Sequence, residues 1–100
     1  MRAVRVATYP VDSGSIEELT TRSQEELIPI YKEQPGFRAL SVVHAGDEIV
    51  SISHWDSAEQ AELGAQAAMN WAKGLGGLVG APTSNRIGEE IASAWIAPGA

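Results

Sequence analysis

Two histidines, His44 and His54, are the only side chains of this sequence whose ordinary pKa lies close to neutral pH. Such a group can take a proton from a phenol or an enol, leaving an electron-rich anion that can reduce dioxygen. Because His54 lies next to Trp55, we take these two as the candidate catalytic residues, although either histidine could be the base. No carboxylate lies near them at a metal-ligand spacing such as HExxH, so we expect no metal site.

Other common chemistries lack the residues that they need. Cysteine is absent, which excludes thiolate catalysis, disulfides and cysteine-ligated zinc. There is no GxSxG motif for a serine nucleophile. The adjacent pairs Glu25-Glu26 and Glu89-Glu90 point apart on a helix or strand, so neither pair can work as two facing carboxylates.

Strand alternation decides which polar side chains can share a site with Trp55. Residues 48–55 read as a strand, on which alternate side chains face the same way. One face then carries Ile49, Ser51, Ser53 and Trp55, and His54 lies on the other. If the preceding turn has two or four residues, His44 joins the Trp55 face, whereas a three-residue turn exchanges the faces.

These residues must be positioned by strands and helices that follow one another in a βαββαβ order. Strands are expected at 4–9, 37–44, 48–55 and 86–96, with a turn at 45–47. Helices are expected behind two capping boxes, Ser15 with Glu18 and Ser57 with Gln60, and Pro29 should disturb the first helix. Two right-handed split βαβ units predict an α+β, ferredoxin-like plait: a four-stranded antiparallel sheet with the helices on one face.

Length and charge restrict the classes of protein. One hundred residues predict a single domain over 1–100, and thirteen acidic against seven basic residues give a net charge of −6. No basic stripe is present, so we expect no nucleic-acid partner and no attraction to an anionic membrane. No apolar run approaches the roughly 18 residues that span a bilayer. The lack of cysteine fits a cytoplasmic location.

Three segments together resemble the antibiotic biosynthesis monooxygenase family. They are VATYPVDSGSIEEL (6–19), KEQPGF (32–37) and ISHWDSAEQA (52–61), and the resemblance covers about residues 2–95. It implies the dimeric α/β-barrel form of the ferredoxin-like fold, with a second copy covering the open face of the sheet. It also implies a pocket between the sheet and the helices.

Site residues transfer from this family only in part. Haem-degrading members use a first-strand asparagine, the tryptophan that ends the third strand and a helix histidine; here these positions hold Ala7, Trp55 and Ala65. We therefore expect no haem and no other cofactor. Quinone-forming members carry an asparagine four residues before the tryptophan, where this chain has Ser51.

The expected pocket suits a flat, largely apolar ligand. Ser51, Ser53, Tyr31 and Trp71 are the candidate substrate-binding residues, beneath a second helix rich in alanine. Arg86 could hold an anionic substrate, and a solvated strand end is the simpler account of it.

The resemblance implies a cofactor-independent monooxygenase, an oxidoreductase acting as a homodimer on a small aromatic or polyketide-like substrate. The alternative is a non-catalytic small-molecule-binding or dimerisation module of the same fold.

Overall fold

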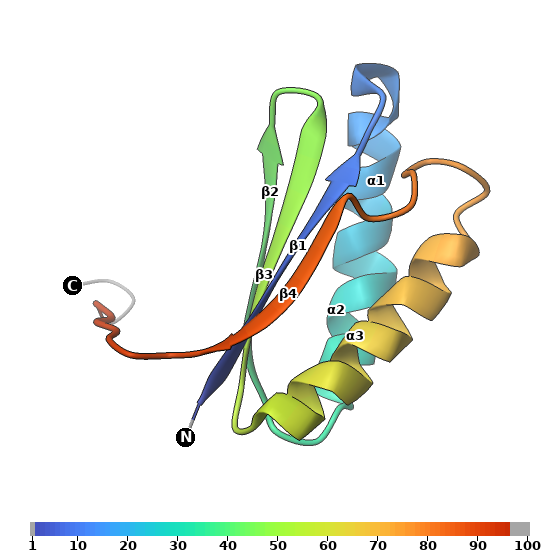
Figure 1. The fold of residues 1–100 in the computed structure, drawn as a ribbon. Helices are drawn as coiled ribbons and strands as arrows, with labels where there is room; N and C mark the ends of the chain where they lie inside the picture. The colour runs from blue at the N-terminus through green and yellow to red at the C-terminus, as the bar shows by residue number, and fades with distance from the viewer. Residues whose placement is uncertain (1, 97–100) are drawn as a thin grey trace.

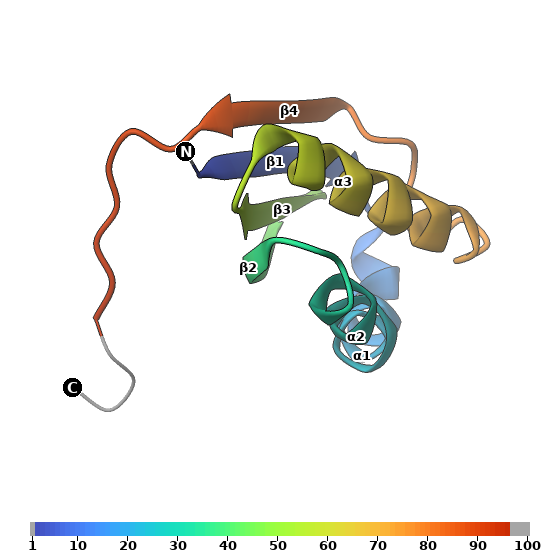
Figure 2. The same ribbon diagram turned by 90° about the horizontal axis from the view of Figure 1, so that it is seen from below.

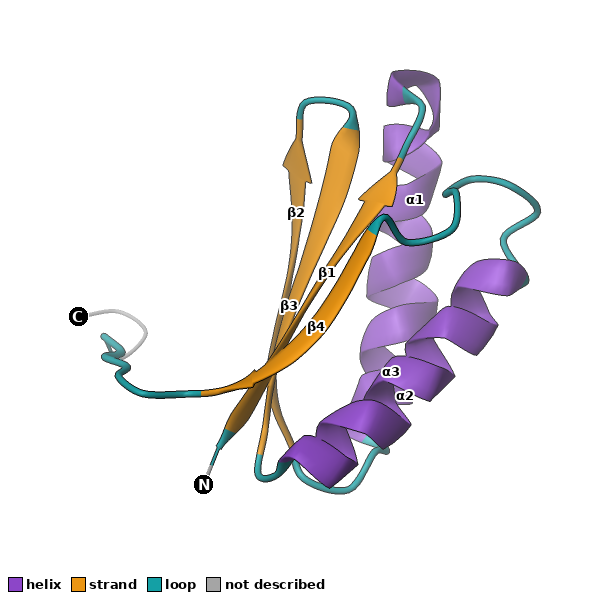
Figure 3. Ribbon diagram, viewed as in Figure 1, coloured by secondary structure: helices purple, strands orange, loops and turns teal. Residues whose placement is uncertain are grey.

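In the computed structural model, which describes residues 2–96, four antiparallel strands form one sheet with every described helix on the same face (Figure 1 and Figure 3). The strands are β1 (Ala3–Pro10), β2 (Phe37–Ala45), β3 (Glu48–Trp55) and β4 (Ser84–Glu89). Their order across the sheet is β2-β3-β1-β4, so the first and third strands are central. The predicted α+β, ferredoxin-like fold is therefore confirmed.

Two helical columns cover one side of the sheet (Figure 2). The first comprises α1 (Ile16–Arg22), a π-helical segment (Ser23–Leu27) and α2 (Ile28–Lys32), and the second is α3 (Ala58–Lys73). The π segment ends two residues before Pro29, which has no N–H to donate to the Glu25 carbonyl. The amide of Ile28 bonds to Ser23 five residues back, so the disturbance expected from Pro29 takes the form of a wider turn.

The two predicted capping boxes have different outcomes. Ser57 is extended, and its hydroxyl accepts a hydrogen bond from the Gln60 amide, so the cap of α3 is confirmed. The cap at Ser15 is wrong, because that residue is already helical (φ −97°, ψ −4°) and its side chain caps nothing. Asp12 acts earlier instead, accepting from the Gly14 amide at the start of a 3₁₀ turn (Ser13–Ser15).

The hairpin between β2 and β3 has a two-residue turn, Gly46-Asp47. Gly46 has a φ of +64°, which is readily adopted only without a side chain. The resulting register places His44 opposite Ile49, so both face the helices. Of the alternatives left open by the sequence, the structure therefore selects the one in which His44 shares a face with Trp55.

The last strand is shorter than predicted, because β4 ends at Glu89 rather than continuing to residue 96. It pairs only with β1, and its register brings Glu89 opposite Ala3. The Glu90 amide still donates a hydrogen bond to the Arg2 carbonyl, but residues 91–96 have no described β1 residue opposite them. They leave the sheet as an extended tail on the side away from the helices (Figure 2).

None of the helices formed by residues 2–96 combines the length and apolar character required to cross a bilayer.

Candidate functional site

A series of hollows runs between the sheet and the two helical columns. The first has a volume of about 210 Å³ between α1 and the β2–β3 hairpin. A narrow neck of about 40 Å³ joins it to the region below α3, and a hollow of about 230 Å³ follows next to the 79–82 loop. We call these three the interlayer groove; successive hollows share lining residues, namely Leu19, Ser23, Val42, Ile49, Tyr9, Ala72 and Val79.

The floor of this groove contains a row of three side chains from adjacent strands. His44 on β2 is opposite Ile49 on β3, and Ile49 is opposite Tyr9 on β1. Since neighbouring strands lie about 4.8 Å apart, the backbones of His44 and Tyr9 lie about 10 Å apart, on either side of Ile49. A flat ring resting on Ile49 would therefore have His44 on one side, in the first hollow, and Tyr9 on the other, at the neck.

The tautomer of His44 follows from its hydrogen bond. Its Nε2 lies 2.7 Å from the Gly46 carbonyl oxygen, which can only accept. The neutral imidazole therefore carries its proton on Nε2 and keeps a lone pair on Nδ1. This nitrogen can serve as a general base for a molecule in the first hollow, which His44 lines.

Arg5, next to this row on β1, is a fully buried cation held by neutral groups. Its Nε donates to Asn85 Oδ1 at 2.8 Å, Nη1 to the Tyr31 hydroxyl at 3.3 Å, and Nη2 to the Tyr9 hydroxyl at 3.0 Å. Within residues 2–96, no carboxylate lies within ion-pairing distance of Arg5. This is unusual, because a buried charge is costly without a counter-charge.

Tyr31 and Ser51 complete the polar cluster around Arg5. Burial raises the pKa of the Tyr31 phenol above its ordinary value of 10.0, a shift opposed by the positive charge of Arg5 and by a hydrogen bond with Ser51. The phenol is therefore protonated at neutral pH and does not supply the negative charge that Arg5 lacks. The structure thus brings one predicted binding residue, Tyr31, onto this guanidinium and places a second, Ser51, next to Tyr31.

Trp55 lies beneath α3 and has no exposed surface. Its indole makes edge contacts with Tyr31 and Phe37, each with ring centroids 5.5 Å apart, and its Nε1 donates to Ser53 Oγ at 2.8 Å. It packs directly against Gly64, where the helix has no side chain. Trp55 and Ser53 therefore form a satisfied core pair behind the groove.

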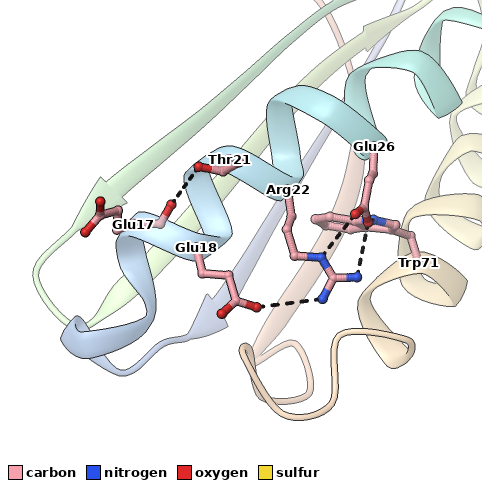
Figure 4. Close-up of polar contacts among 6 residues, drawn as sticks. All are labelled: Glu17, Glu18, Thr21, Arg22, Glu26 and Trp71. Carbon is pink, nitrogen blue, oxygen red and sulfur yellow. Dashed lines mark hydrogen bonds and ion pairs between the residues drawn. The ribbon is translucent and has the colours of Figure 1, made fainter.

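Trp71 lines the neck of the groove and joins the two helical columns (Figure 4). Its Nε1 donates to Glu26 Oε1 at 2.9 Å, and the guanidinium of Arg22 donates twice to the same carboxylate, at 3.2 Å each. These hydrogen bonds, from Arg22 first and Trp71 second, hold the pKa of Glu26 below its usual value of 4.5. The arrangement fixes the indole of Trp71 at the position where the groove is narrowest.

His54 does not join this site, because strand alternation turns it to the opposite face of the sheet. Its Nδ1 is buried and has no hydrogen-bond partner among residues 2–96; it lies 3.7 Å from Glu90 Oε1, and the ring contacts Trp95 of the tail with centroids 5.3 Å apart. Trp55 and His54, adjacent in sequence, thus lie on different sides of the sheet. Of the two histidines, His44 is the one that lines the groove.

Arg5 and Asn85 were missed by the sequence reasoning. Arg5 alternates with Ala3, Ala7 and Tyr9, so the pattern did contain a signal: a charged residue on the inward face of a central strand. Asn85 fell outside the strand predicted to begin at residue 86. Arg86, the arginine that could hold an anionic substrate according to the sequence, is exposed and lies opposite Val6 on the open face.

Across residues 2–96, no three histidine, aspartate or glutamate side chains gather in a way that could hold a metal ion. Ala65, the α3 position that the family resemblance matched to the histidine of haem-degrading members, is buried and has no donor atom. The residues present do not fit haem ligation from α3.

Several solved structures share this fold. A protein from Chloroflexus aurantiacus described as an antibiotic biosynthesis monooxygenase has 15% identity and a TM-score of 0.70, covering 96% of this chain and 99% of its own. A monooxygenase from the ActVA-Orf6 gene of Streptomyces coelicolor, in complex with nanaomycin D, has 21% identity and a TM-score of 0.69, covering 94% and 91%. The haem-degrader MhuD of Mycobacterium tuberculosis, with two haems bound, has 18% identity and a TM-score of 0.71, covering 93% and 99%.

The chain spans 66% of the length of another neighbour, MupZ from Pseudomonas fluorescens, with 8% identity and a TM-score of 0.72. No protein-family model and no curated protein sequence matches this chain. Because the identities to these four structures are all below 25%, the likenesses show the fold. They confirm the expectation of an antibiotic-biosynthesis-monooxygenase architecture.

Proposed function

We propose that this protein is a cofactor-independent monooxygenase that acts on a small aromatic or polyketide-like substrate in the interlayer groove. A solved monooxygenase structure of the same fold holds nanaomycin D, which supports a small organic substrate for this fold. The residues of this chain would act as the base and as the walls of an apolar site, and dioxygen would be the oxidant.

One observation carries the proposal: His44 and Ile49 line a hollow large enough for a ring, and Tyr9 continues their row at the neck. A hollow of about 210 Å³ exceeds the roughly 150 Å³ of an engineered protein cavity that binds benzene. Nδ1 of His44 would take a proton from an acidic O–H or C–H of the substrate, and the electron pair left behind would make the ring electron-rich. The surrounding apolar wall would exclude water from that anion.

Oxygen consumption tests this function. The metal-free protein, treated with a chelator, is mixed with anthrone or a hydroquinone, and dioxygen uptake is followed with an electrode. Uptake above the protein-free rate supports the proposal, and no turnover with any such substrate counts against it.

Two matched substitutions decide which histidine is the base. A larger loss of turnover in His44→Gln than in His54→Gln supports the groove site, because only His44 lines it. The reverse order would support the adjacent pair Trp55 and His54 that the sequence suggested. General acid–base groups contribute typically 10²–10⁴-fold, so a loss in that range is expected for the true base.

A non-catalytic binding protein is the second candidate, favoured by Ser51 at a position where the quinone-forming proteins carry asparagine. Ser51 is only 6% exposed and interacts with Tyr31 rather than with open space. This candidate predicts ligand binding without oxygen uptake. Trp55→Phe then distinguishes a structural from a catalytic tryptophan. If Trp55 is structural, the substitution lowers stability more than it lowers turnover.

A homodimer is proposed because the face of the sheet opposite the helices carries exposed apolar side chains that residues 2–96 leave uncovered. Val6 and Val43 on this face are 39% and 43% exposed, and the tail beyond β4 exposes Ile91, Trp95 and Ile96 on the same side (Figure 2). Sedimentation equilibrium tests this, and a monomer at all concentrations would refute it. We also propose a cytoplasmic location and a single domain over 1–100, which cell fractionation and limited proteolysis would test.

A further inference from the structure

The groove has no acidic lining although the protein is strongly acidic. The chain carries thirteen acidic and seven basic residues. None of the described residues that line the three hollows is an aspartate or glutamate, whereas His44 and Lys73 are among them. Glu26 reaches Trp71 at the neck, but Arg22 already pairs with its carboxylate. The described lining of the groove therefore contributes no negative charge, although the whole molecule is acidic.

Arg5 supplies a positive charge immediately behind this lining. A guanidinium has five N–H groups and stays protonated in proteins. Three of the five are used, all on neutral oxygens of Asn85, Tyr31 and Tyr9. In the described part of the chain, this leaves two N–H groups, one on each terminal nitrogen, and no anion to balance the charge.

Tyr9 connects this charge to the groove. Its hydroxyl accepts from Arg5, and Tyr9 is a lining residue of both the neck and the hollow next to the 79–82 loop. No acceptor for the Tyr9 O–H is found among the described residues, so that proton can point toward a bound molecule. A hydrogen bond donated by a group that itself accepts from a cation is strengthened, because each bond polarises the next.

We propose that Arg5 and Tyr9 form an oxyanion-binding site, so that the groove takes flat aromatic ligands in their ionised form, as phenolates or aryl carboxylates. The oxyanion accepts from the Tyr9 O–H with Arg5 directly behind, and the ring extends over Ile49 toward His44. This inference rests on the proposed function for the identity of the groove as the ligand site, but it concerns binding and requires no turnover.

The test uses 4-nitrophenol, whose phenolate has its own visible absorbance band. The probe is titrated with pH in the presence and absence of excess protein, without any oxygen-dependent readout. The wild type should lower the apparent pKa of the bound phenol by about one unit or more, which corresponds to at least tenfold tighter binding of the phenolate. An unshifted pKa, or no binding of the probe, overturns the proposal.

Variants locate the effect. Tyr9→Phe and Arg5→Met should each reduce the shift, and Lys32→Met, which removes one positive charge from an exposed position on α2, should retain it. If Arg5→Met does not fold, Tyr9→Phe decides, because it removes one hydroxyl and keeps the ring. A shift that persists in folded Tyr9→Phe and Arg5→Met refutes the assignment.

Calorimetry with 2-naphthoate and the neutral 2-naphthamide distinguishes the two sources of the oxyanion. Tighter binding of the naphthoate, lost in Tyr9→Phe, extends the site to carboxylates, whereas a preference confined to 4-nitrophenolate restricts it to phenolates. The proposal is overturned if the protein binds 2-naphthoate and 2-naphthamide equally well and also binds 4-nitrophenol and its phenolate equally well. Anion preference without oxygen uptake would refute the oxygenase and keep this site, and uptake without anion preference would do the opposite.

Discussion

Replacement of Gly64 by alanine sets two known effects against each other. Gly64 is a buried position in the middle of α3, and its replacement by alanine should gain about 1 kcal/mol in helix propensity. A Cβ at this position would, however, overlap three atoms of the six-membered ring of Trp55. The sign of the result depends on whether the indole can move.

The structure indicates that the indole cannot move easily. Trp55 has no exposed surface, contacts the rings of Tyr31 and Phe37, and is fixed by its hydrogen bond to Ser53. Overpacking of a core usually costs about 1–3 kcal/mol, and a rigid ring with three overlapping atoms belongs at the upper end. After the gain in helix propensity is subtracted, we expect Gly64→Ala to lower the free energy of unfolding by about 2 kcal/mol.

Urea denaturation measures this change, at one protein concentration so that any subunit association is held constant. The exposed position Gln66 on the same helix provides the control, since the difference between Gln66→Ala and Gln66→Gly gives the propensity effect alone. A stabilised Gly64→Ala protein would refute the reasoning, because it would mean that α3 and the indole separate at no cost.

Three further predictions concern the groups around the groove. Trp55→Ala should lower the free energy of unfolding by about 3–5 kcal/mol in urea titrations, as expected for a large core aromatic, and a loss near zero would show that the indole lies in open space. The pKa of Glu26 is lowered in the folded protein, so the stability that its contacts with Arg22 and Trp71 provide should be present above pH 4.5 and lost as the pH falls through the folded pKa. Glu26→Gln should weaken this loss of stability at acid pH in fluorescence-monitored unfolding, and an unchanged pH dependence would contradict the prediction. Because the pKa of Tyr31 is raised, the stability contributed by the protonated phenol should be present below pH 10.0 and lost as the pH rises through the folded pKa. In ultraviolet absorbance, one tyrosine should ionise at a higher pH than an ordinary tyrosine, and this high-pH ionisation should be absent from Tyr31→Phe.

Much of the fold could be predicted from short-range patterns. The β3 bounds, the cap at Ser57 and the inward face of β3 all follow from residues close in sequence. The predictions failed where a partner elsewhere in the chain decided the outcome. The length of β4 depends on where β1 begins, and the helix start near Ser15 depends on how the preceding turn reaches α1.

The candidate site shows the same division. The sequence by itself determined that Ser51, Ser53 and Trp55 share one face, because a strand places alternate side chains on the same side. It could not show that Arg5 lies with Tyr9, Tyr31 and Asn85, since Asn85 is eighty positions away and reaches Arg5 only through the pairing of β4 with β1.

Nor could the sequence show which histidine faces the groove, because that depended on a turn of two rather than three residues. The tertiary structure decided these points for a physical reason: a buried charge acquires its partners from whatever the packing of sheet and helices brings within hydrogen-bonding distance. Residue types and alternation fix which way a side chain points, and only the closed arrangement of the strands fixes what it meets.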